Sequence, residues 1–397
     1  MRALVYGLGR SGRAAAERLA ERGDEVVEVD RSLGNELDLS LLDGVDVLVK
    51  SPGVPGERPL VTVARERRIP VWSEVELGYR LLPGGARLVG VTGTNGKTTT
   101  AELLGAIFRE AGRSVAVAGN VGTPLASVRE ADWVVCELSS FQLEDVHELA
   151  CDVAVLLNIE PDHLDRHGSL EDYRAAKLRI FERARVAVVP RGLTAAPLPS
   201  HRVTMVTRCE IAFGADDPLP AEPLLRGAHN RENAAAATAA ARAAGLGDDA
   251  IAAALASFPG VAHRLELVAE AGGVRFVNDS KATNVAAARR ALAAYAGEPV
   301  HLILGGSLKG EDFGPLAEAV GPNVRSVHLI GEASGRLAAV LPGHDDGTLE
   351  RAVEHAAGLA RPGDVVLLSP ACASYDQFEN FEQRGEEFRR LSRSLRR

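Results

Sequence analysis

The chain has 397 residues, of which 46% are hydrophobic and 25% are charged, and its formal net charge is −9. This length exceeds what one small hydrophobic core needs, so we expect two or three domains. The acidic balance argues against general binding to nucleic acid or to a membrane surface. The chain has no run of about 18 to 20 apolar residues, as a membrane span requires, and ALVYGLG at its start predicts a strand rather than a signal segment.

Three α/β units follow one another along the chain. The first alternates the strands ALVYG, EVVEVD, VDVLVKSPG and IPVWS with helices, one of them predicted from Arg13 to Arg22. Apolar strands between helices favour a parallel sheet covered on both faces. Pro83, Gly84 and Gly85 mark a break, and a second break falls near Pro259. We therefore predict an α/β protein with domains at residues 1–86, 87–260 and 261–397.

A first glycine cluster opens the first unit. Gly7, Gly9 and Gly12 form G-x-G-x-x-G between a strand and a helix, and Asp30 ends the next strand. Such glycines let the backbone approach a diphosphate, and the acid can bind a ribose hydroxyl. Arg31 suits a further anionic group. The pattern fits NAD, NADP or any nucleoside diphosphate, and it also fits a simple tight turn.

A second glycine cluster, GVTGTNGKTTT, starts the second unit and predicts a phosphate loop. Gly93 and Gly96 free backbone N–H groups to surround phosphate oxygens, Lys97 reaches the β- and γ-phosphates, and Thr98 offers a hydroxyl to Mg²⁺. The motif is a variant, because Val91 stands where the standard P-loop has glycine.

Acids and imidazoles follow the next strands of this unit. Glu137 ends the strand WVVCEL, where a P-loop fold places a Mg²⁺ ligand. NIEPDHLDRHGS brings His163 and His167, and its spacing fits a ligand or phosphate contact as well as a charged surface loop. Ser169 is the predicted N-cap of a helix that carries Lys177.

Lysine is rare in this chain, since only five of its 45 basic residues are lysines. Arginine keeps its charge and its planar fork, whereas lysine can lose its proton and react. We therefore expect lysine where a guanidinium would fail. The five are Lys50, Lys97, Lys177, Lys281 and Lys309.

The cysteines lack the spacing of a metal site. We expect free, buried thiols in a reducing cytoplasm. No base accompanies Cys372 in SPACAS, so a buried thiol is favoured over a nucleophile there. The four are Cys136, Cys151, Cys209 and Cys372.

Taken together, TGTNGKTTT, ELSSFQLE, NIEPDHLDRHGSLEDYRAAK, HNRENAAAA, NDSKATN and SPACASYDQFENFEQRGEEF resemble the Mur ligases of peptidoglycan synthesis. The resemblance spans nearly the whole chain in order. NDSKATN and SPACAS…NFEQRG point to the branch that adds D-glutamate to UDP-N-acetylmuramoyl-L-alanine. The resemblance implies a Rossmann-like N-terminal domain for the UDP-sugar, a central P-loop ATPase-like domain and a Rossmann-like C-terminal domain for the amino acid. We expect a monomer.

The resemblance also implies ATP-driven amide formation through an acyl phosphate. Two Mg²⁺ ions would neutralise the phosphates, held by Thr98, Glu137, His163 and a carbamate that CO₂ forms on Lys177. The implied catalytic residues are Lys97, Glu137, His163 and Lys177. The implied ATP-binding residues are Gly93, Thr94, Asn95, Gly96, Lys97, Thr98, Thr99, Asn233, Arg264 and Asp279.

The two remaining substrates have implied sites in the outer domains. The residues implied for the UDP-sugar are Gly9, Arg10, Ser11, Gly12, Asp30, Arg31, Ser51 and Asn120. Those implied for D-glutamate are Lys281, Thr283, Lys309, Ser374 and Phe381.

Two other classes of function remain open. An NAD(P) dehydrogenase would explain the first glycine cluster but not the phosphate loop. A non-enzymatic nucleotide switch would not need Glu137, His163 and Lys177 together.

Overall fold

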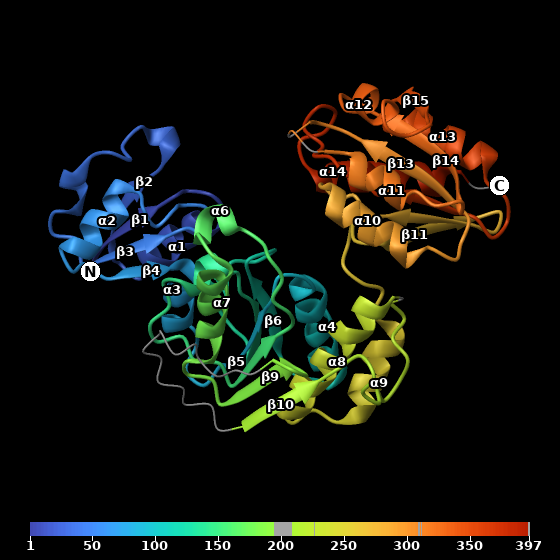
Figure 1. The fold of residues 1–397 in the computed structure, drawn as a ribbon. Helices are drawn as coiled ribbons and strands as arrows, with labels where there is room; N and C mark the ends of the chain where they lie inside the picture. The colour runs from blue at the N-terminus through green and yellow to red at the C-terminus, as the bar shows by residue number, and fades with distance from the viewer. Residues whose placement is uncertain (194–208, 226, 309, 311, 396–397) are drawn as a thin grey trace. The chain divides into compact units, whose positions relative to one another are not determined.

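The computed structural model describes residues 1–193, 209–225, 227–308, 310 and 312–395. Contacts divide the chain into two compact units, Met1–Phe258 and Pro259–Arg397, and each is described by itself. The first unit contains two sheets and the second contains one (Figure 1). The division into three domains stays a prediction. No helix among the described residues combines the length and apolar character that a membrane crossing requires.

The N-terminal sheet is parallel, with the strand order β2-β1-β3-β4. The first helix begins three residues before the predicted start, because the extended Gly9 is its N-cap. The strands are β1 (Arg2–Tyr6), β2 (Glu25–Val29), β3 (Val47–Lys50) and β4 (Val71–Ser73), and the helices are α1 (Arg10–Glu21), α2 (Pro59–Glu66) and α3 (Glu74–Arg80).

The central sheet is also parallel, in the order β10-β9-β8-β5-β7-β6. Cys209 is exposed on the edge strand β10, so the prediction of four buried thiols is wrong there; the other three cysteines are buried. The strands are β5 (Arg87–Thr92), β6 (Val115–Gly119), β7 (Trp133–Glu137), β8 (Val153–Leu156), β9 (Val186–Pro190) and β10 (Cys209–Phe213).

Helices flank this sheet, and α4 packs against α8 and α9 (Figure 1). Ser169 caps α7 by accepting a hydrogen bond from the backbone N–H of Asp172 at 3.0 Å, as predicted. The helices are α4 (Lys97–Glu110), α5 (Ser140–Leu143), α6 (Leu164–His167), α7 (Leu170–Leu178), α8 (Ala228–Ala243) and α9 (Asp248–Ser257).

The C-terminal unit has a mixed sheet in the order β11-β12-β16-β13-β14-β15, in which only β11 runs antiparallel to its neighbour. Its strands are β11 (Glu266–Ala271), β12 (Val274–Asn278), β13 (Val300–Gly305), β14 (Val324–Ile330), β15 (His344–Gly347) and β16 (Val365–Leu368). Its helices are α10 (Val285–Ala294), α11 (Gly314–Ala319), α12 (Ser334–Ala338), α13 (Leu349–Leu359) and α14 (Phe381–Ser394).

Candidate active site

The predicted phosphate loop joins the central strand β5 to α4. Gly93 and Gly96 have φ values of +155° and +84°, which side chains rarely adopt. A Cβ on Gly96 would also overlap the side-chain oxygen of Asn233, which comes from α8. Glycine is therefore required at Gly96 for two reasons, and Asn233 lies against the loop, where an ATP contact was predicted for it.

Two lysines converge on this loop. Nζ of Lys97 donates to the carbonyl oxygens of Gly93 and Thr94, each at 2.9 Å. Nζ of Lys177 donates to the same Gly93 oxygen at 2.8 Å. Because a single neutral carbonyl receives both ammonium groups, the two positive charges lie close together.

Lys177 is almost completely buried, with 2% of its surface exposed. Its Nζ lies 4.6 Å from the centre of the Tyr173 ring. Burial, followed by repulsion from Lys97, lowers the pKa of Lys177 to about 7, and Asp162 and Glu137 offset this only partly. A substantial fraction of neutral amine is therefore present near neutral pH. An arginine here would stay charged.

The loop is held from the end of β8. The backbone N–H of Asn95 donates to the side chain of Asn158 at 2.8 Å, and the amide of Asn95 donates to Glu160 at 2.8 Å. The hydroxyls of Thr94 and Tyr173 lie 3.0 Å apart. These bonds fix the conformation of the loop, and the ATP contacts of Thr94 and Asn95 stay a prediction.

Glu137 ends β7 beside the phosphate loop. In the sheet, Glu137 pairs with Val91 of β5, and only Thr92 separates Val91 from the phosphate loop. Only 3% of the surface of Glu137 is exposed. The side-chain amide of Asn120 donates to Oε1 of Glu137 at 3.3 Å. A buried carboxylate at this position suits a Mg²⁺ ion. Asn120 was predicted to face the sugar, and in this structure its amide is directed at Glu137.

His163 stands in the loop after β8 with φ of +52°, an uncommon conformation for histidine. Its side chain is exposed, and its ring centre lies 5.0 Å from that of Phe141. Nε2 lies 3.5 Å from a carboxylate oxygen of Asp162. Such backbone strain is found at functional sites more than elsewhere. An imidazole, a carboxylate and a hydroxyl are donor types that fit a divalent cation, and the joint role of His163, Glu137 and Thr98 stays a prediction.

Side chains from neighbouring strand ends hydrogen-bond to the first glycine cluster. A Cβ on Gly12 would overlap the carbonyl oxygen of Gly7, and the hydroxyl of Ser51 donates to that oxygen at 2.6 Å. Asp30 accepts the backbone N–H of Leu8 at 2.7 Å. Asp30 also caps the next turn, since it accepts from Ser32, and these bonds lower its pKa. The structure therefore brings the predicted UDP-sugar residues of the N-terminal sheet to one edge.

Two arginines connect this edge to the central sheet. Arg10 donates to the carbonyl of Gly122 at 3.2 Å. Arg166 donates to the carbonyls of Pro52 and Val54 at 3.0 and 3.1 Å. The segment after Ser51, a predicted UDP-sugar residue, is thus hydrogen-bonded to α6, which follows the predicted metal ligand His163.

Lys50 occupies the same junction. It is 1% exposed, and its Nζ lies 3.0 Å from Asp145 and 3.8 Å from Glu144. Arg65 binds the other oxygen of Asp145 at 2.8 Å. Lys50 therefore makes a buried ion pair that joins β3 to the segment after α5.

The C-terminal unit brings several predicted residues together at the ends of its parallel strands. Asp279 follows β12 and accepts a hydrogen bond from Ser369 at 2.7 Å, while burial raises its pKa to about 7. Nζ of Lys281 lies 5.8 Å from the centre of the Phe381 ring. Lys309 lies outside the described residues. Arg264 belongs to this unit too, so the prediction that it and Asp279 bind ATP remains untested.

Comparison with known proteins identifies the family. A model described as "Mur ligase middle domain" matches residues 91–198, and one described as "Mur ligase, glutamate ligase domain" matches residues 263–372. A UDP-N-acetylmuramoylalanine--D-glutamate ligase of Acidobacterium capsulatum is 42% identical over 98% of this chain and 95% of its own length. The chain belongs to the Mur ligase family.

Two further relatives agree with this. A protein of the same name from Anaeromyxobacter dehalogenans is 43% identical over 98% of this chain and 97% of its own length. The crystal structure of UDP-N-acetylmuramate-alanine ligase MurC from Thermotoga maritima covers 99% of both chains with a TM-score of 0.63 at 18% identity. At that identity, the structural match supports the Mur ligase fold alone.

Arg384, which the sequence motifs did not single out as a site residue, organises the C-terminal part of this Mur ligase. Arg384 is 1% exposed, and its guanidinium donates to Ser280, Cys372 and Ala373 at 2.9 to 3.1 Å. Ser280 in turn donates to the carbonyl of Phe381 at 2.8 Å. Arg384 thereby holds NDSKATN, SPACAS and the start of α14 as one assembly, which includes Thr283 and Ser374. The arginine in NFEQRG was the available signal.

His167 is a second residue left without a role. Nε2 lies 2.9 Å from the hydroxyl of Ser140, Nδ1 lies 3.3 Å from Glu144, and the ring stacks on Phe141 at 5.1 Å. Burial, then Arg166, His163 and Lys177, lowers its pKa. A neutral His167 therefore supports the loop that carries His163.

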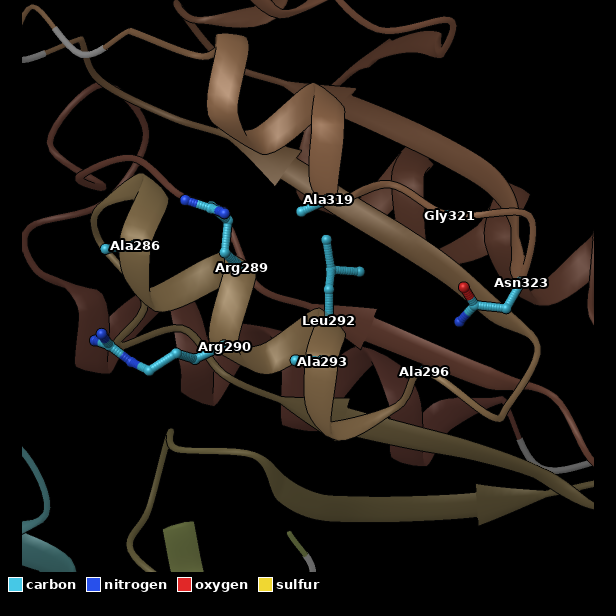
Figure 2. A pocket seen from close by; sticks show the side chains of 9 residues that line it. All are labelled: Ala286, Arg289, Arg290, Leu292, Ala293, Ala296, Ala319, Gly321 and Asn323. Atoms are coloured by element: carbon cyan, nitrogen blue, oxygen red, sulfur yellow. The ribbon is translucent and has the colours of Figure 1, made fainter. Parts of the chain in front are cut away.

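The C-terminal unit contains a hollow beside the helices α10 and α11. It has a volume of about 580 Å³ and lies between α10 and the end of α11, lined by Arg289, Leu292 and Asn323 among others (Figure 2). None of the predicted glutamate residues lines it. This hollow is therefore not part of the predicted glutamate site.

Proposed function

We propose that this protein is an ATP-dependent ligase that joins D-glutamate to UDP-N-acetylmuramoyl-L-alanine and releases ADP and phosphate. The proposal is carried by the end-to-end identity of about 42% to relatives that bear the corresponding name. We further propose a cytoplasmic monomer.

The reaction needs charge neutralisation and alignment more than covalent help. The carboxylate of the alanyl group attacks the γ-phosphorus of ATP, ADP leaves, and an acyl phosphate remains. The amine of D-glutamate then attacks the acyl carbon, and phosphate leaves while the amine loses a proton. In this proposal the N–H groups from Gly93 to Thr99 hold the phosphates, and Lys97 swings from its carbonyl partners to the transferred group.

Mg²⁺, when bound, would neutralise phosphate charge and align the reacting oxygens. Thr98, Glu137 and His163 would hold it, and their oxygen and imidazole donors fit this role. Asn120 would orient Glu137 through the hydrogen bond to Oε1. Asn233 and the contacts of Asn95 would keep the loop in its binding conformation.

Lys177 would act as a carbamate. Its neutral amine attacks the carbon of CO₂, a C–N bond forms, and one proton goes to solvent, so the neutral amine becomes an anion that could support the second metal. The lowered pKa supports this step, because only the unprotonated amine is a nucleophile. The close approach of Lys97 would favour the resulting anion.

The outer substrates would bind at the two strand-end clusters. We propose that Gly9, Arg10, Ser11, Gly12, Asp30, Arg31 and Ser51 hold the UDP-sugar. We propose that Lys281, Thr283, Lys309, Ser374 and Phe381 receive D-glutamate, while Arg264 and Asp279 contact the nucleotide.

Phosphate release tests the function directly. The purified protein receives UDP-N-acetylmuramoyl-L-alanine, ATP and Mg²⁺ with D-glutamate, L-glutamate, L-alanine or meso-diaminopimelate. We expect release only with D-glutamate. Release with L-alanine or diaminopimelate instead would overturn the proposed specificity, and saturable NADH binding without UDP-sugar binding would favour a dehydrogenase.

A further inference from the structure

Three side chains with metal-binding chemistry meet at the edge of the C-terminal sheet, and none of them was assigned a role above. His328 is in β14, Asp346 is in β15 and His355 is in α13. Their donor atoms all lie within 4.8 Å of one another. Nδ1 of His328 lies 2.7 Å from Oδ2 of Asp346, and Nδ1 of His355 lies 2.9 Å from Oδ1.

The register of the sheet explains how they meet. His328 pairs with His344 across the parallel strands β14 and β15, and Asp346 lies at the register irregularity just beyond, where its carboxylate meets His328. The helix α13 follows at once and covers that side with Ala352, Val353 and Ala356 in the core. His355, which lies on the partly exposed side of the same helix, reaches the carboxylate of Asp346. Three separate elements therefore supply the cluster.

A hydrogen-bonded chain runs inward from this cluster. Nε2 of His328 lies 2.8 Å from the hydroxyl of Ser326, which lies 2.7 Å from Nδ1 of His301. Nε2 of His301 lies 3.1 Å from Asp364. The chain has four contacts between two carboxylates, but two neutral imidazoles and one hydroxyl supply only three protons. One positive charge is therefore missing from the chain.

With a neutral His301 the missing charge belongs at the Asp346 end, and a second proton on His301 is the alternative. Arg325 lies 3.2 Å from Asp364, and the N–H of Arg361 donates to the same oxygen at 2.9 Å, so Asp364 is held as a carboxylate. His301 then donates to Asp364, Ser326 donates to His301, and His328 donates to Ser326. This order leaves Nδ1 of His328 as a lone pair aimed at Oδ2 of Asp346, and two acceptors repel at 2.7 Å unless a cation lies between them.

A proton on His328 is the less favourable cation. The side chain is fully buried, and a charged imidazolium loses its hydration there. A metal ion, by contrast, uses the lone pair and the carboxylate together with the second imidazole. Histidine ligands commonly donate their other ring N–H to a fixed acceptor, as His328 does to Ser326.

We propose that His328, Asp346 and His355 bind a divalent transition-metal ion of the zinc type. Two imidazoles and one carboxylate suit zinc, cobalt or nickel and disfavour magnesium. His344 is exposed, with its ring centre 4.5 Å from that of His355, and is placed to give the fourth ligand. Ligand atoms around tetrahedral zinc are about 3.3 Å apart, so the two short contacts would open by roughly half an ångström. The ion would fasten the edge strand β15 and α13 to β14.

Zinc binding by the full-length protein tests this site. Chelator-treated protein is titrated with Zn²⁺ against a chromophoric chelator in millimolar Mg²⁺, which competes at the proposed ATP site. We expect one equivalent bound with a Kd below about 1 μM, and at least about a tenfold weaker Kd in His355→Gln. His355 is partly exposed, so this variant should fold. Glu354→Gln, an exposed neighbour on the same helix, should bind zinc like the parent.

Two further measurements separate this proposal from the others. His163→Gln should keep the zinc site, because it changes only the proposed ATP-site metal. Zinc should raise the melting temperature of the parent, and not of His355→Gln, while phosphate release in chelated buffer with Mg²⁺ should be equal in the two. An equal zinc Kd in parent and His355→Gln, or no binding tighter than about 100 μM, would overturn the proposal and leave a proton as the missing charge.

Discussion

Two buried lysines of the first unit have opposite surroundings. Lys50, 1% exposed, faces Asp145 at 3.0 Å and Glu144 at 3.8 Å. Lys177, 2% exposed, donates to the neutral carbonyl of Gly93, and Lys97 is the charge that perturbs it most. The first lysine is compensated, whereas the second is made easy to deprotonate.

This difference shows that burial alone does not mark a reactive amine. A buried charge with a carboxylate partner is a structural feature, and removing one partner is costly. A buried ammonium beside another ammonium has a lowered pKa, which is the state that reaction with CO₂ needs. The same residue type therefore holds two parts of the unit together at one place and offers chemistry at the other.

Replacing each lysine by arginine should give the largest contrast. We expect Lys177→Arg to lose at least about 100-fold in phosphate release, because a guanidinium cannot form the carbamate. Lys50→Arg should stay within about fivefold, since arginine can still pair with Asp145. Steady-state assays with D-glutamate measure both. Addition of short carboxylates should partly restore Lys177→Ala, and a Lys177→Arg enzyme with near-parent activity would refute the carbamate.

Removal of the Lys50 charge should mainly affect stability. We expect Lys50→Met to lower the free energy of unfolding by about 3 kcal/mol, because Asp145 keeps only Arg65 as a cationic partner. Both tryptophans, Trp72 and Trp133, belong to the first unit, so urea unfolding followed by tryptophan fluorescence reports on this unit.

Arg67→Met is the matched control for that measurement. It removes an exposed pair with Asp43, with 44% and 71% of the two side chains exposed, and should cost less than about 1 kcal/mol. Equal losses in the two variants would show that the Lys50 pair is no stronger than a surface pair.

The pH dependence of stability should reveal the lowered pKa of Lys177. The pKa of Lys177 is about 7 in the folded protein against 10.5 ordinarily, so the unfolded chain binds more protons between these values. The buried ammonium of Lys177 therefore destabilises the folded protein fully below pH 7, and this effect disappears as the pH rises toward 10.5. The free energy of unfolding of Lys177→Met minus that of the parent should therefore be about 2 kcal/mol larger at pH 6.5 than at pH 9.

This comparison uses CO₂-free buffer and the same fluorescence measurement. Carbon dioxide would convert part of Lys177 to an anion and obscure the proton linkage. A pH-independent difference between Lys177→Met and the parent would show that the ammonium is not destabilised by its surroundings.

The smallest expected effect concerns the bridge between the two loops. Arg166→Ala removes the hydrogen bonds to Pro52 and Val54, which follow the predicted sugar contact Ser51. We expect the KM for the UDP-sugar to rise about three- to tenfold with little change in kcat, as the loss of about 1 kcal/mol of positioning predicts. Arg185→Ala, an exposed arginine of the same unit, should leave KM unchanged.

Local patterns were the predictable part of both fold and site. The strand–turn–helix at Gly93, Gly96 and Lys97, the cap at Ser169 and the strand-end acid Glu137 each depend on a few adjacent residues. The sequence alone could not show that Cys209 lies on an exposed edge strand, because strand order depends on the whole sheet.

The amino-acid sequence by itself determined the family, the parallel α/β architecture and the kinds of residue that gather at the strand ends. Tertiary structure alone decided what each charged group faces. Arg384 reaches Ser280 over 104 positions, Lys50 meets Asp145, and His328 meets Asp346 and His355. Those contacts join separate helices, strands and loops of the chain, and the charge state of a buried group depends on its neighbours in space, which no local pattern contains.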